Sequence, residues 1–71
     1  MEIDRLDLEN MRDTVVSSPS WELIEENMTP NGDMVVRYHN EMTCVDCFIY
    51  YEKGMDQEYY LYKIAFKDCM N

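Results

Sequence analysis

The chain has 71 residues, 46% of them hydrophobic, and a formal net charge of −9. This length fits one domain, and a core of this size supplies only about 3–5 kcal/mol, so oligomerisation would be unsurprising. The negative charge argues against direct binding of nucleic acid or of an anionic membrane. The excess lies in residues 1–41, which hold ten acids and three arginines. It would attract basic patches on other proteins, or simply keep a small chain soluble.

The beginning of the chain, residues 1–10, is acidic and has no apolar run. We therefore expect neither a signal peptide nor a membrane span, and we expect a cytoplasmic protein. Three cysteines in such a chain predict reduced thiols and not a disulfide framework.

The first predicted element is a helix with Asp7 as its N-cap, although an earlier start at Asp4 also fits. Its buried stripe would be Leu8, Met11 and Val15. Leu6 and Met11 would form a hydrophobic staple, and Pro19 would end the helix.

Residues 20–28 have two interpretations. Ser18-Pro19 could cap a helix, since Trp21, Ile24 and Met28 have helical spacing. Asn31-Gly32 between two β-like runs instead predicts a hairpin that joins residues 20–28 to residues 33–39. We favour the strand.

Residues 43–52 and 58–66 are rich in β-branched and aromatic side chains and predict a second hairpin. Its loop would be residues 53–56, with Gly54 at positive φ. Tyr50 would then pair with Tyr59, Phe48 with Leu61 and Asp46 with Lys63. The core face of this hairpin would hold Thr43, Val45, Cys47, Ile49, Tyr60, Tyr62, Ile64 and Phe66.

A tight turn at Asn40-Glu41 would pair His39 with Met42. The same face would then gain Trp21, Leu23, Met34, Val36 and Tyr38, and agreement between independent turns supports it. Glu25 and Asn27 do not fit this face. The predicted fold class is α+β: one N-terminal helix packed on a four-stranded antiparallel β-meander (α-β-β-β-β), a single domain over residues 1–71.

The opposite face of the sheet is predicted to be exposed, and it also carries apolar side chains. These are Val35, Phe48, Tyr50, Tyr59 and Leu61. Such a patch either marks an interface or reflects ordinary cross-strand packing.

The candidate chemistry is limited. Cys44 and Cys47 could be drawn with His39 and Cys69 as a zinc site, but on a strand Cys44 and Cys47 would point to opposite faces. The expected roles are a surface thiol for Cys44 and a small core residue for Cys47. His39 is expected to be exposed at a strand end, with a Cys44–His39 couple as a distant alternative. We predict no enzyme activity, no metal and no cofactor.

Two functions from different classes remain. The first is a small acidic protein-binding module, an inhibitor or decoy that occupies a basic site, for example a nucleic-acid-binding site, on a host protein such as a defence nuclease. Its predicted contacts are Val35, Phe48, Tyr50, Tyr59, Leu61, Glu22, Glu25, Glu26 and Asp33. Small size, acidity and the absence of a catalytic motif resemble phage-encoded antagonists, including anti-CRISPR proteins and other DNA mimics; the resemblance is one of type and rests on no particular residue. The second is a structural or assembly protein that forms a homodimer or larger oligomer through the aromatic sheet face.

Overall fold

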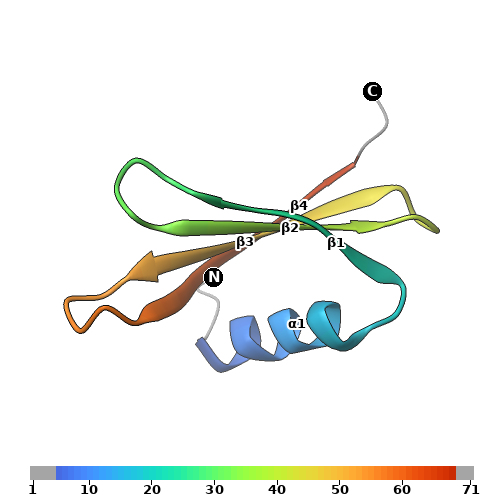
Figure 1. The fold of residues 1–71 in the computed structure, drawn as a ribbon. Helices are drawn as coiled ribbons and strands as arrows, with labels where there is room; N and C mark the ends of the chain where they lie inside the picture. The colour runs from blue at the N-terminus through green and yellow to red at the C-terminus, as the bar shows by residue number, and fades with distance from the viewer. Residues whose placement is uncertain (1–4, 69–71) are drawn as a thin grey trace.

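The computed structural model describes residues 5–68 and shows one helix followed by four strands. Helix α1 spans Arg5–Ser17, and the strands are β1 (Trp21–Met28), β2 (Met34–Asn40), β3 (Val45–Lys53) and β4 (Tyr59–Asp68). The strands form one antiparallel sheet in the order β1-β2-β3-β4, and α1 lies against one face of it (Figure 1). The predicted α+β meander is confirmed.

Helix α1 begins before Asp7, which is therefore not its N-cap, and Asp4 lies outside the described residues. Val15 is 3% exposed and Leu8 packs against the core, as the predicted stripe requires. Met11 is exposed, so its predicted place in the buried stripe is wrong. Leu6 is exposed as well, so these two residues do not close a buried staple. The helix ends at Ser17, before Pro19, as predicted.

Residues 20–28 form a strand and not a helix, and the Asn31-Gly32 hairpin is confirmed. The turn is closed by Thr29 N–H to the Asp33 carbonyl (2.8 Å) and Gly32 N–H to the Thr29 carbonyl (2.9 Å). Gly32 has φ +90°, a conformation that a side chain disfavours. A β-bulge at Ile24 then turns Glu25 and Asn27 away from the helix, which removes the misfit in the predicted face.

The connection between β2 and β3 is longer than the predicted tight turn. Residues 41–44 all form the turn, and the Asn40 side-chain oxygen accepts the backbone N–H of Met42 (3.0 Å) and Thr43 (3.2 Å). His39 consequently pairs with Asp46 and not with Met42. The shift is by four residues, an even number, so the side chains of β3 keep their predicted faces.

The β3–β4 hairpin departs most from prediction. Its loop is residues 54–58, so Lys53 pairs with Tyr59, and a bulge at Tyr62 follows between the pairs Tyr51–Leu61 and Tyr50–Lys63. From Lys63 onward, the side chains of β4 lie on the faces of the sheet that the sequence predicts. The side chains of Tyr59, Tyr60 and Leu61, which precede the bulge, lie on the opposite faces from those predicted.

Gly54 does not have the positive φ that we expected. Its role is close approach, because a Cβ atom there would lie 2.7 Å from Tyr60 Cε2 and 2.8 Å from Asp56 Oδ1. The left-handed residue of this loop is Gln57, at φ +68°.

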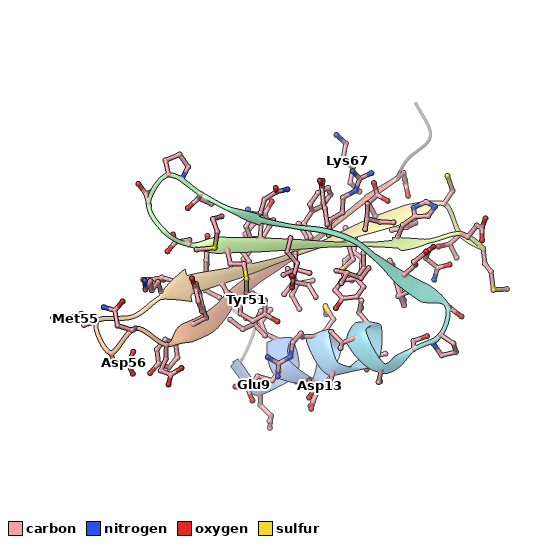
Figure 2. All side chains as sticks on the ribbon, viewed as in Figure 1. Glu9, Asp13, Tyr51, Met55, Asp56 and Lys67 are labelled. Atoms are coloured by element: carbon pink, nitrogen blue, oxygen red, sulfur yellow. The ribbon has the colours of Figure 1, made fainter. Side chains whose placement is uncertain are left out.

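The core lies between the sheet and α1. Its buried residues come from the helix and three strands: Val15, Val36, Cys47, Ile49 and Leu61. Figure 2 shows Tyr51 on the helix side of the sheet and Lys67 on the opposite side. We call these two sides the helix face and the open face.

Candidate functional site: the open face of the sheet

The open face combines one polar cluster with one aromatic cluster. The register and contacts of the strands place there Glu22, Glu25, Val35, Arg37, His39, Asp46, Phe48, Tyr50, Tyr60, Tyr62, Lys63 and Lys67.

The polar cluster is centred on Asp46, which is only 6% exposed although α1 does not cover it. One carboxylate oxygen lies 2.7 Å from His39 Nδ1, and the other accepts a hydrogen bond of 2.8 Å from Arg37 Nη2. These bonds, that of His39 first, hold the pKa of the Asp46 carboxyl below its usual range, against the opposing effect of burial. The residues that cover Asp46 are thus also its charge partners.

Arg37 extends the polar cluster to both neighbours of β2. Its Nη1 lies 3.5 Å from Glu25 Oε1 on β1, and its guanidinium carbon lies 5.9 Å from the centre of the Phe48 ring on β3. A guanidinium at this distance from an aromatic face is attracted by the ring quadrupole. Arg37 therefore connects the acids with the aromatic cluster.

The aromatic cluster consists of Phe48, Tyr50 and Tyr62. The Tyr50 and Tyr62 rings are 6.2 Å apart and tilted by 53°, and Lys63 Nζ lies 5.0 Å from the centre of the Tyr50 ring. Phe48 and Tyr50 are half-buried, whereas Tyr62 is 46% exposed. The cluster is available for contact, but lysine and arginine cover part of it.

The predicted aromatic contact residues separate into two groups. Val35, Phe48 and Tyr50 lie on the open face, as predicted. Tyr59 and Leu61 lie on the helix face, and Leu61 is in the core at 6% exposure, so their predicted placement on the open face is wrong. The bulge at Tyr62 is the cause, because one extra residue exchanges the faces of all residues between it and the loop.

The predicted acidic contacts are also divided. Glu22 and Glu25 lie on the open face, whereas Glu26, beyond the Ile24 bulge, lies on the helix face at the exposed edge of β1. Asp33 has a structural contact, since its Oδ1 accepts the backbone N–H of Lys53 (3.1 Å).

Sequence reasoning missed Tyr60 and Tyr62, which were assigned to the core but are 43% and 46% exposed. It also missed the pairing of His39 with Asp46, and His39 is half-buried rather than exposed. Asp46 between strongly β-forming residues was a usable signal, because a carboxylate in a central strand needs cationic partners on the neighbouring strands.

The cysteines differ from the expected set of reduced thiols. Cys44 lies in the turn before β3, with φ +55°, and is disulfide-bonded. Cys47 is a fully buried free thiol whose pKa burial raises to about 11, and Cys69 lies outside the described residues. Within residues 5–68, no group of three or more His, Cys, Asp or Glu side chains is placed to hold a metal ion.

His39 and Asp46 are arranged like the base and acid of a hydrolytic triad, with the carboxylate orienting the imidazole. Cys44, the nucleophile considered with His39 from the sequence, is disulfide-bonded and does not supply a thiolate. The pair is accounted for by the hydrogen bond that it provides to a buried carboxylate.

Searches against protein-family models, curated proteins and solved structures find no match to this chain. In the part of the chain that the structure describes, no helix has the length and apolar character needed to cross a membrane.

Proposed function

We propose that this chain is a protein-binding module that occupies a basic site on a partner protein and so acts as an inhibitor or decoy. The observation that carries the proposal is the number of carboxylates that form no salt bridge within the described residues. Of the acidic residues between positions 5 and 68, only Asp13, Glu25 and Asp46 form salt bridges within that range. Among the remaining carboxylates, Asp33 and Asp56 accept internal hydrogen bonds, and the others are available to cations of another molecule.

Four of these carboxylates lie in the first two elements: Asp7, Glu9, Glu22 and Glu26. Helix α1 and strand β1 contain six acids and two arginines. Asp7 on α1 and Glu26 on β1 are exposed and form no salt bridge with another described residue. Figure 2 shows Glu9 and Asp13 on the side of α1 away from the sheet. An acidic surface of this kind attracts a basic cleft over a distance that depends on ionic strength.

The fitting partner is a protein with arginines and lysines arranged for phosphate, because carboxylates pair with the same groups. A nucleic-acid-binding enzyme, such as a nuclease of a host defence system, has a site of this chemistry. Occupying that site would exclude the nucleic acid without any catalytic step by this chain.

The test is capture of proteins from a bacterial lysate on immobilised chain, followed by competition with DNA. We expect a captured protein to elute as salt rises, and the soluble chain to displace labelled duplex DNA from the purified partner. The variant Asp7→Asn/Glu9→Gln/Glu26→Gln should compete about tenfold less well, because each lost exposed pair contributes up to about 1 kcal/mol.

The matched control removes the same charge elsewhere. Glu41, Glu52 and Glu58 are exposed and lie outside α1 and β1, so Glu41→Gln/Glu52→Gln/Glu58→Gln should compete nearly as well as the wild-type chain. Capture that does not depend on salt, or equal losses for the two triple variants, would contradict the proposal.

A further inference from the structure

Both edge strands of the sheet carry a β-bulge, at Ile24 in β1 and at Tyr62 in β4. Bulges and charged side chains on an edge oppose the addition of a strand from another chain. The edges of this sheet are therefore poor interfaces. The Tyr62 bulge also adds a ring to the open face, beside Tyr50.

Charge on the open face is ordered across the strands. The residues paired at one end of the sheet form a row from β1 to β4: Glu22, His39, Asp46 and Lys67. The acidic end of the row is on one edge strand and the lysine is on the other. Nearer the middle, Glu25 is again on β1 and Lys63 on β4, although the two lie in different rows: Glu25 is in the row of Arg37 and Phe48, and Lys63 is paired with Tyr50.

The charges of the row from Glu22 to Lys67 are complementary to those of the same row in a second copy whose strand order runs in the opposite direction. If two sheets pack through their open faces about a two-fold axis parallel to the strands, β1 of each copy lies over β4 of the other. Glu22 then faces Lys67 of the second copy, and the contact occurs twice, as two-fold symmetry requires. A two-fold axis across the strands would instead place β1 over β1 with its direction reversed, so Glu22 would not face Lys67 of the second copy.

We propose that the open face binds a second copy of this chain about the axis parallel to the strands. Phe48, Tyr50 and Tyr62 form the apolar centre of this contact, and the charged row forms its rim, the usual anatomy of a protein interface. Face-to-face sheets pack about 10 Å apart, a gap that tyrosine rings fill and that glutamate and lysine side chains together span. The acids of α1 and Glu26 stay outside the contact, so dimerisation is independent of the proposed decoy function.

The experiment is sedimentation velocity of the whole chain from about 1 µM to about 1 mM, a range that covers weak to moderate affinities. The wild-type mass should rise from one chain to two. Glu22→Lys and Lys67→Glu should each weaken the dimer about tenfold, because each creates two like-charge contacts. The double variant should return to within about threefold of the wild type.

Recovery of the dimer in the double variant is decisive because of where Glu22 and Lys67 lie within one copy. Glu22 and Lys67 are on opposite edge strands and form no salt bridge with each other in one copy, and on the open face the side chains of His39 and Asp46 lie between them. Only a contact between copies explains recovery in the double variant.

Two matched controls test charge without touching the open face. Glu26→Lys and Lys53→Glu make the same charge changes on the helix face and should leave the dimer unchanged. Far-ultraviolet circular dichroism shows whether each variant folds. A wild-type mass of one chain at every concentration, equal weakening by Lys67→Glu and Lys53→Glu, or no recovery in the folded double variant would each overturn the proposal.

Discussion

Trp21 of β1 and Phe66 of β4 form a tilted ring pair with centroids 6.0 Å apart, although their strands are the two edges of the sheet. A second contact joins the same strands, since the Tyr59 hydroxyl lies 3.7 Å from Met28 Sδ. Long side chains of the two edge strands therefore meet on the helix face, across the two strands that separate β1 from β4. The hydrogen-bonded ladder alone does not join β1 to β4.

This relationship predicts an energetic coupling between Trp21 and Phe66. We expect Trp21→Ala and Phe66→Ala to be non-additive by about 0.5–1.5 kcal/mol, the range for aromatic pairs. The measurement is a double-mutant cycle by urea unfolding. Additive losses would mean that the rings do not interact in solution.

The bulge at Tyr62 predicts opposite sensitivities for two adjacent residues. Leu61→Ala should destabilise the fold by about 2–4 kcal/mol, because Leu61 is buried and its loss leaves a cavity. Tyr62→Ala should cost less than about 1 kcal/mol, because its ring is near the surface. Urea midpoints of the two variants test the assignment, and a larger loss for Tyr62→Ala would restore the register first predicted from the sequence.

The environment of Asp46 predicts a dependence of stability on pH. Its folded-state pKa is lowered, so its contribution is present above the ordinary carboxyl pKa of about 4 and is lost as pH falls through the lower folded-state value. Asp46→Asn should therefore lower the urea midpoint at neutral pH and lower it much less at strongly acidic pH. The groups that face Asp46 are His39, Arg37 and Lys67, all cationic or able to become so.

A control separates this effect from the loss of one negative charge. Glu41 is exposed in the turn before β3, so Glu41→Gln should leave the midpoint nearly unchanged at either pH. A deficit of Asp46→Asn that stays constant from neutral to strongly acidic pH would contradict the assigned role of the carboxylate.

The burial of Cys47 predicts a thiol protected from alkylation. With full burial and a pKa of about 11, iodoacetamide at about pH 8 should leave Cys47 unmodified in the folded chain and modify it in concentrated urea. Peptide mapping by mass spectrometry identifies this residue separately from the other cysteines. Modification of the native chain at the rate of an exposed thiol would show that Cys47 is not in the core.

Local patterns in the sequence were sufficient for the elements, their order and most of their faces. Pro19 ends the helix and Asn31-Gly32 makes the first turn because backbone geometry at these residues is set by their own chemistry. The alternation in β2 and β3 predicts Val36, Cys47 and Ile49 as core and Phe48 as open-face, and the structure places them so. These assignments of side chains to faces are correct because the predicted and observed registers of β2 and β3 differ by an even number of residues.

Only the tertiary structure decided what lies on the open face. The bulges at Ile24 and Tyr62 have no local sequence signal; they set which side chains of the edge strands reach the helix face, where Trp21 packs against Phe66 and Leu61 joins the core. Each bulge exchanges the faces beyond it, so it moved Tyr62 outward, Leu61 inward and Glu25 toward Arg37. A strand's pattern of side chains is local, but its register is fixed by the balance of packing over the whole sheet, and that balance selects which residues meet another molecule.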